Sequence, residues 1–397
     1  MRLRFSDYVL DTERRELWRG TQPVRVEPQV FDLLAFLVEN RGHVVTKDDV
    51  FAAVWHGRIV SEATLSSRIN AVRRAIGDTG EKQHLLRTVH RHGFRFVGEV
   101  ASADVNARLS ARVSESGDAL EQKIRFCRSP DGTRLAIGNV GSGAALVKTA
   151  NWLNHLEFDW ESPVWSPFLR KLASHYRLVR YDARGNGLSD RQVDELSFDA
   201  FVTDLETVAD AMDLKRFSLL GISQGASVAI AYAIRHPQRV EKLVLMGAYA
   251  QGRNKRGTPT DAEQARALLT LMRSGWGQEH SAFMQAFSSI YLPKGTPEQI
   301  SWFTDLQRKT TSPENAIRIR LACDQIDVTE LLAKVTVPTL VMHSRHDNVA
   351  PFDQGRLIAS SIPGARLVSL ESDNHVPLQG EPAWDRMVRE VLSFLGT

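Results

Sequence analysis

The chain has 397 residues, a length that is too great for one ordinary domain and suits two. Hydrophobic residues make up 43% of it, yet no run of about 18 apolar residues occurs, which argues against a membrane-spanning helix. The first residues carry no apolar signal region, so we expect a cytoplasmic protein. The two cysteines, Cys127 and Cys323, have neither metal-ligand nor redox spacing, and we predict no metal ion and no cofactor.

The positive charge of the chain is concentrated near its beginning. Residues 1–100 hold 16 Lys and Arg against 13 Asp and Glu, whereas the rest of the chain holds 34 of each. This asymmetry predicts an anionic partner for the first part alone.

Short elements fill these hundred residues. Residues 1–26 alternate apolar and polar side chains between turn-prone stretches, which predicts a small antiparallel sheet. Pro28 suits the first turn of a helix, and Thr46 with Asp49 predicts the capped start of a second. Ser61 caps a third helix, whose apolar stripe is Leu65, Ile69, Val72 and Ile76.

The opposite face of the third helix is polar and basic, and two strands joined by a basic turn follow it. Arg and Asn on a helix can contact base edges in a major groove, and a basic hairpin can contact phosphates. A charged helix face is more often merely solvated, but order, spacing and sign here agree with a DNA-binding surface. We predict contacts to double-stranded DNA by Ser67, Arg68, Asn70, Arg73, Arg74, Thr88, His90 and Arg91.

Residues 3–100 resemble the winged helix-turn-helix of OmpR/PhoB-type response regulators, most closely the ToxR/CadC branch. The motifs are Glu27-Pro28-Gln29-Val30-Phe31, Gly42-His43-Val44-Val45-Thr46-Lys47, Val60-Ser61-Glu62-Ala63-Thr64-Leu65 and Arg87-Thr88-Val89-His90-Arg91-His92-Gly93-Phe94-Arg95-Phe96. The resemblance implies a bacterial regulator that binds specific DNA sequences. We expect a homodimer, because one winged helix buries little surface on DNA.

Residues 101–122 are small, polar and weakly patterned, which predicts a linker between a domain at 1–100 and one at 123–397. In the second domain apolar strands alternate with helices, a pattern typical of a doubly wound, mainly parallel sheet. The strands are expected near 145–149, 177–181, 217–222, 242–246, 338–343 and 366–370.

A Gly-x-Ser-x-Gly turn, residues 221–225, joins one of these strands to a helix. It predicts that Ser223 lies in a strained conformation where the strand bends into the helix, with the helix N–H groups beside it. The alternative is a tight connection with an exposed serine. Serine needs an imidazole base oriented by a carboxylate, and Asp347 and His375 each follow a later strand in the required order. We therefore predict a catalytic triad of Ser223, Asp347 and His375.

These motifs resemble the α/β-hydrolase fold over nearly all of residues 123–397. The resemblance implies that Ser223 is the nucleophile, His375 the base and Asp347 its orienting group. It also implies a helical cap at about 249–326. The aromatic side chains there either line an apolar ligand pocket or pack the cap helices together, and they are Trp276, Phe283, Phe287, Tyr291, Trp302 and Phe303.

One loop departs from the family pattern. After the third strand the family usually has His-Gly, whereas this chain has Thr149-Ala150-Asn151-Trp152-Leu153. By position, the backbone N–H groups of Trp152 and Gln224 would form the oxyanion hole. Asn151 in place of Gly narrows the backbone options of this loop, so we expect weak turnover. The Ala-Asn-Trp-Leu variant resembles hydrolase modules fused to signalling outputs, in which the fold senses a ligand more than it processes one.

The leading hypothesis is a DNA-binding transcriptional regulator whose α/β-hydrolase domain binds a small acyl compound, either with or without hydrolysing it. The compound would be an ester, lactone or amide. The second hypothesis is an active serine hydrolase, an esterase or lactonase, with an accessory DNA-binding domain. A third is a binding-only receptor with a vestigial triad, against which the complete set of three residues argues.

Overall fold

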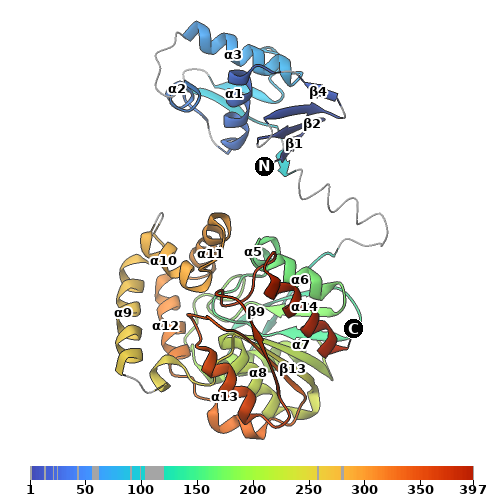
Figure 1. Ribbon diagram of the computed structural model, residues 1–397, viewed down its shortest axis with the longest axis vertical. Helices are drawn as coiled ribbons and strands as arrows, with labels where there is room; N and C mark the ends of the chain where they lie inside the picture. The colour runs from blue at the N-terminus through green and yellow to red at the C-terminus, as the bar shows by residue number, and fades with distance from the viewer. Residues whose placement is uncertain are drawn as a thin grey trace. The chain divides into compact units, whose positions relative to one another are not determined.

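The computed structural model describes residues 2–12, 15–20, 22–24, 26–42, 44–55, 62–89, 92–98, 100–102, 120–256, 259–278 and 281–396. The chain forms two compact units, Met1–Asp118 and Ala119–Thr397 (Figure 1). No helix in the described ranges is long and apolar enough to cross a membrane.

The first unit combines an antiparallel sheet with three helices. The sheet order is β4-β3-β2-β1-β7, and its strands are β1 (Arg2–Phe5), β2 (Tyr8–Asp11), β3 (Glu16–Arg19), β4 (Gln22–Val24) and β7 (Val100–Ser102). The helices are α1 (Pro28–Glu39), α2 (Lys47–Trp55) and α3 (Glu62–Ala75). A hairpin of β5 (Leu86–Val89) and β6 (Gly93–Phe96), here called the wing, follows α3.

The structure confirms the sequence predictions for the helices α2 and α3 of this unit. The predicted cap of α2 forms, since the Thr46 N–H donates to Asp49 at 2.9 Å and the Asp49 N–H donates back to the Thr46 hydroxyl at 3.2 Å. The apolar stripe of α3 is buried, and it packs in one core with α1, α2, the sheet and the wing. The predicted cap residue Ser61 lies outside the described residues.

Strand β7 was not foreseen. It pairs with β1, with Ser102 opposite Leu3, so residues 100–102 complete the sheet of the first unit. At the other end of the predicted linker, Gln122 donates to the Leu156 carbonyl at 3.1 Å and accepts a hydrogen bond from Arg180. Both ends of the 101–122 range therefore make ordered contacts.

The second unit is built on an eight-stranded sheet of order β15-β14-β13-β12-β10-β11-β9-β8. Strand β9 is antiparallel to both neighbours and the other pairs are parallel. The strands are β8 (Lys123–Arg128), β9 (Arg134–Val140), β10 (Ala145–Lys148), β11 (Arg177–Tyr181), β12 (Phe217–Ile222), β13 (Val240–Met246), β14 (Thr339–Ser344) and β15 (Arg366–Leu370). The predicted doubly wound sheet is confirmed.

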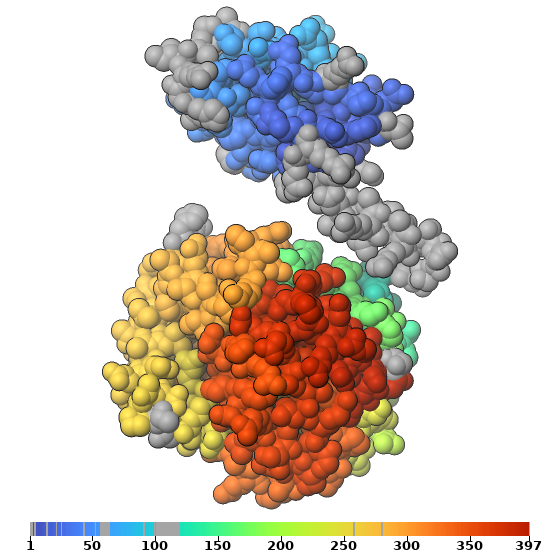
Figure 2. All heavy atoms as spheres, in the orientation of Figure 1, coloured from blue at the N-terminus to red at the C-terminus, as the bar shows by residue number. Residues whose placement is uncertain are grey.

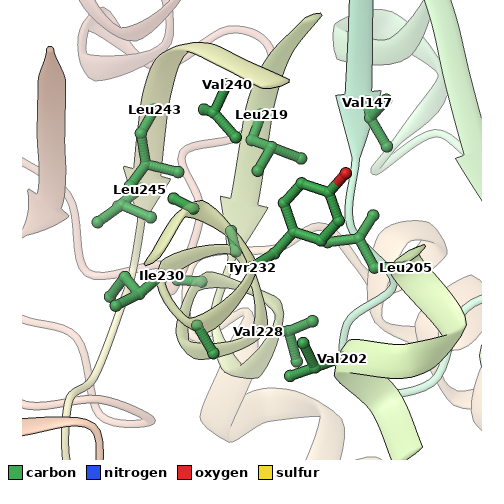
Figure 3. Packing of buried hydrophobic residues seen from close by; sticks show 14 of the residues in the cluster. Val147, Val202, Leu205, Leu219, Val228, Ile230, Tyr232, Val240, Leu243 and Leu245 are labelled. Atoms are coloured by element: carbon green, nitrogen blue, oxygen red, sulfur yellow. The ribbon is translucent and has the colours of Figure 1, made fainter. Parts of the chain in front are cut away.

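Helices cover both faces of this sheet. One face packs against α7 (Phe198–Ala211), α8 (Gln224–Arg235) and α13 (Phe352–Ser361), and the other against α6 (Ser166–Ala173) and α14 (Pro382–Leu395), with the short α5 (Leu156–Glu161) before α6. Figure 3 shows Tyr232 of α8 lying among Val147, Leu219 and Leu205, so the helix after Ser223 is anchored in the core. Short 3-10 turns are η1 (Pro237–Arg239), η2 (Arg253–Lys255) and η3 (Thr329–Lys334).

Four helices between β13 and β14 form the cap. They are α9 (Pro259–Gly275), α10 (Ala282–Tyr291), α11 (Pro297–Thr310) and α12 (Pro313–Asp324), gathered on one side of the sheet (Figure 1). In Figure 2 the orange part of the cap lies directly against the red C-terminal segment. The cap has its own apolar cluster, which reaches Trp152 and Leu153 below it.

Candidate active site

The turn at Ser223 is strained, as its sequence predicts. Ser223 has φ 54° and ψ −127°, a conformation that a side-chain-bearing residue rarely adopts. A Cβ at Gly221 would lie 2.5 Å from Ala226 Cα, and one at Gly225 would lie 2.5 Å from the Ala150 carbonyl oxygen. Both glycines are therefore needed for strand, helix and neighbouring loop to approach each other.

Asp347 and His375 form a buried hydrogen-bonded pair. The His375 Nδ1–H donates to Asp347 Oδ2 over 2.6 Å, and Oδ1 accepts the N–H groups of Val349 and Ala350 at 2.7 and 3.1 Å. Burial raises the pKa of Asp347, but the charge of His375 and hydrogen bonds from His343 and His375 outweigh it and hold this pKa well below its usual range. The carboxylate is thus ionised at neutral pH and fixes the imidazole, leaving Nε2 available.

The remaining nitrogen of His375 has no hydrogen-bond partner in the described chain, although it is buried. Ser223 and His375 meet the same stretch at the end of β13: the Ser223 N–H donates to the Met246 carbonyl at 2.9 Å, and the imidazole packs on Gly247. A Cβ at Gly247, where φ is 52°, would lie 2.9 Å from His375 Cε1. Sequence analysis missed this glycine, although its position directly after a central strand was a usable signal.

The predicted oxyanion-hole residues, Trp152 and Gln224, line one pocket together with Ser223. Gln224 is the first residue of α8, so its N–H precedes the helical hydrogen-bond ladder and points out of the helix end. The open space in the pocket is about 20 Å³, which holds about one water molecule. Little open space therefore surrounds Ser223 in this structure.

The loop at 149–153 is held by side-chain hydrogen bonds. Thr149 donates to the Gly225 carbonyl at 2.9 Å, and the Asn151 amide donates to the Trp152 carbonyl at 3.2 Å. The Lys148 ammonium donates to the Asn151 side chain at 2.5 Å, and burial lowers the pKa of Lys148 to about 8. Asn151 therefore anchors the loop through its side chain, and the left-handed residue is Leu153, with φ 40°.

The cap aromatics mostly pack on one another. Trp276 and Phe287 surround the Trp152 ring, and Trp302 stacks on Phe158 at 4.3 Å between centroids. Of the six aromatics named from the sequence, only Tyr291 lines the Ser223 pocket within the described ranges. The rest of its lining is unexpectedly charged, since it includes Arg253, Arg256, Arg320 and Asp324.

The structure describes six of the eight predicted DNA-binding residues, and these six differ in their surroundings. Ser67, Asn70 and Arg74 are exposed on α3 at spacings of three and four, and so share one helix face. Arg68, on the same helix, is ion-paired with Glu27. His90 and Arg91 lie outside the described residues.

The burial of Arg73 contradicts the prediction that this residue contacts DNA. Only 7% of it is exposed, and its guanidinium donates to the Leu86 carbonyl at 3.1 Å and the Thr88 hydroxyl at 2.7 Å. It joins α3 to the wing and is too buried to lie on the exposed face of the helix. Thr88 remains exposed, but its hydroxyl is engaged in this bond.

The strand order, the strained serine and the Asp–His pair define a hydrolase fold, and comparison with known families agrees. The chain belongs to the α/β hydrolase fold family, whose model matches residues 154–382. Residues 21–96 match the model of the C-terminal domain of transcriptional regulatory proteins, a winged helix that binds DNA. The fusion inferred from the sequence is therefore confirmed.

Individual relatives that cover about two thirds of the chain agree with the hydrolase assignment. The AB hydrolase superfamily protein YisY of Bacillus subtilis (strain 168) is 26% identical, over 63% of this chain and 91% of its own. A hydrolase from Pseudomonas aeruginosa PA01 superposes with a TM-score of 0.59 and 27% identity, over 69% of this chain and 99% of its own. The esterase EaEST from Exiguobacterium antarcticum gives 0.59 and 26%, over 68% and 99%.

Proposed function

We propose that this protein is a transcriptional regulator that binds DNA through its first unit and binds a small acyl compound, which it hydrolyses, beside Ser223. The observation that carries the proposal is the buried Asp347–His375 pair. Its imidazole packs on Gly247 directly after β13, next to the Met246 carbonyl that accepts the N–H of the strained Ser223. An ester, lactone or amide is the class of compound that this chemistry attacks.

The geometry supports a two-stage reaction. Ser223 Oγ attacks the acyl carbonyl while His375 Nε2 takes its proton, and Asp347 stabilises the imidazolium. The N–H groups of Gln224 and Trp152 would stabilise the oxyanion. His375 then returns the proton to the leaving group, and water hydrolyses the acyl-enzyme by the same route. Relatives that are named a hydrolase and an esterase support this class of chemistry.

Ligand binding can influence DNA affinity only if it favours one conformation over another. The pocket supports such a difference, because a space of about 20 Å³ is too small for an acyl compound, so residues that line it, among them Arg320 of the cap, must shift when one binds.

A second candidate is an active hydrolase with an accessory DNA-binding unit. Relatives that are named a hydrolase and an esterase favour it, whereas the complete hydrogen bonding of Asp347 supports hydrolysis in both candidates. The two candidates differ in whether an acyl compound alters DNA binding.

The test uses the full chain. Duplexes are selected from a random pool by the wild type, and hydrolysis is followed with 4-nitrophenyl esters. Ser223→Ala should lower hydrolysis by at least about 10³-fold while keeping duplex binding. Ser360→Ala, an exposed serine on α13, is the control and should change neither.

Each outcome decides a separate claim. Failure to enrich any duplex would reject the regulator. Undiminished hydrolysis by Ser223→Ala would reject Ser223 as the nucleophile. If the ester changes the affinity of Ser223→Ala for its duplex, the ligand acts by binding, and if only the wild type responds, the acyl-enzyme or product is the signal. No response in either protein favours the second candidate.

A further inference from the structure

Three arginines line the pocket that holds Ser223. Arg253 belongs to η2 and Arg256 follows this turn, while Arg320 comes from α12 of the cap. The two segments lie more than sixty residues apart in the chain, and the fold brings their side chains to one small space.

Only part of this positive charge is neutralised. Arg320 forms a two-point ion pair with Asp324, at 2.7 and 3.1 Å, and Asp324 is the one acid among the lining residues that the structure describes. Arg256 donates to the Gln251 carbonyl at 3.1 Å, lies 5.7 Å from the centre of the Tyr249 ring and is attracted by Asp261. Two guanidinium groups thus remain without a hydrogen-bonded carboxylate inside the pocket lining.

Arg253 is the least satisfied of the three. Within the described ranges its guanidinium has no hydrogen-bond or ion-pair partner. Burial, and then the charge of Arg320, lowers the pKa of Arg253, yet a guanidinium stays protonated in proteins. The side chain is only partly buried, so its N–H donors are open to an anion that enters the pocket.

We propose that the acyl compound bound beside Ser223 carries a carboxylate, which Arg253 and Arg256 bind while the scissile carbonyl lies at Ser223. This inference rests on the proposed function of the Ser223 site. A guanidinium presents paired N–H donors that match the two oxygens of a carboxylate. The substrate class is thus a half-ester or lactone derived from a dicarboxylic acid. Hydrolysis of a half-ester adds water across its ester bond and yields a dicarboxylate and an alcohol.

The kinetic test compares two esters of equal acyl length, mono-4-nitrophenyl glutarate and the neutral 4-nitrophenyl pentanoate. The full-length wild type should prefer the glutarate in kcat/KM by about tenfold or more, because charge-assisted hydrogen bonds to the carboxylate contribute to binding. Arg253→Met should bring the ratio of the two values close to one, and Arg253→Lys should restore part of it. Arg266→Met, which removes an exposed arginine from α9, should keep the wild-type ratio.

A binding measurement separates this inference from the proposed hydrolysis. Ser223→Ala protein is titrated with glutarate and with neutral dimethyl glutarate, and binding is measured by calorimetry. Tighter binding of glutarate, lost on adding Arg253→Met, supports the carboxylate site even if no ester is ever hydrolysed. Equal binding of the two compounds, or a wild-type kinetic ratio near one, would overturn it, even if Ser223 proves to be the nucleophile.

Discussion

His375 occupies a space that only a glycine at position 247 leaves open. The imidazole is held on one side by Asp347 and meets the Tyr291 ring edge-on, with 5.7 Å between the ring centroids, while the backbone N–H of His375 donates to the Tyr291 carbonyl at 2.9 Å. The base is therefore clamped between the end of the sheet and the cap. A displacement of the cap that admits a ligand would act directly on the chain segment that carries His375.

The substitution Gly247→Ala tests whether hydrolysis depends on this placement of His375. The new Cβ would lie 2.9 Å from His375 Cε1 and would strain a backbone at φ 52°. We expect ester hydrolysis to fall about 10²-fold, because small displacements of a catalytic group have effects of this order. Gly364→Ala is the matched control, since it also has positive φ but no atom within 4 Å. Equal kcat/KM in the two variants would show that hydrolysis does not depend on the placement of His375 against Gly247.

The substitution Asp347→Asn removes the negative charge of this side chain and keeps its shape. An amide cannot stabilise the imidazolium, so hydrolysis should fall on the order of 10³–10⁴-fold. The lowered folded-state pKa of Asp347 also makes it a source of acid sensitivity. Its carboxylate stabilises the fold above the unfolded pKa of about 3.9, and this contribution is lost as the pH falls below that value.

The free energy of unfolding by urea at pH 7, 5 and 3.5 measures this contribution. The wild type should lose more stability between pH 5 and 3.5 than Asp347→Asn does. Parallel curves for the two proteins would show that the folded-state pKa of Asp347 is not depressed.

At the scale of elements, a buried arginine fastens the loop after β11 to helix α7. Arg184 is 1% exposed, and it donates to both oxygens of Asp204 on α7, at 2.6 and 2.7 Å, and to Asp131 at 2.6 Å. Burial raises the pKa of Asp204, against the effect of Arg184. The pairing therefore compensates a desolvation penalty that either partner alone would bear.

Arg184→Met should lower the free energy of unfolding by about 3–5 kcal/mol, because it leaves Asp204 buried without its cation. Chemical denaturation of the full chain measures the change. Arg235→Met is the control, since it breaks a surface pair with Asp199 and should cost at most about 1 kcal/mol. If the two variants lose equal stability, the buried pair has no special role.

At the scale of the whole molecule, the chain divides into two units with different partners. The exposed face of α3 carries Asn70 and Arg74, which we propose contact DNA, whereas Arg73 is used inside the first unit. An amide can specify a base, but a single cation to phosphate adds affinity for any duplex. Substitution of Asn70 and substitution of Arg74 should therefore weaken DNA binding in different ways.

Arg74→Ala should weaken binding to selected and random duplexes alike and reduce the salt-dependence slope by about one. Asn70→Ala should instead reduce the preference for the selected duplex by about 1–3 kcal/mol. Titration of fluorescent duplexes at several salt concentrations distinguishes these effects, with Arg19→Ala, outside α3 and the wing, as control. Ester hydrolysis should be unchanged in both variants, and its loss would indicate misfolding.

Much of the architecture followed from local patterns. The elbow at Ser223, the capping pair of Thr46 and Asp49 and the helix from Gln224 to Arg235 depend on residues a few positions apart. Strand alternation and the order of motifs then predicted a parallel sheet with serine, acid and histidine at strand ends. These features were accessible because turn chemistry and hydrophobic periodicity act over short distances in the chain.

The tertiary structure alone decided what distant residues do to each other. It shows that Arg73, which was predicted to contact DNA, joins α3 to the wing, and that β7 belongs to the first sheet. It also assembled Arg253, Arg256 and Arg320 around Ser223, where one of the two alternatives drawn from the sequence had placed aromatic side chains. Periodicity states which face of a helix is polar, but the charge within a pocket depends on which segments pack across it.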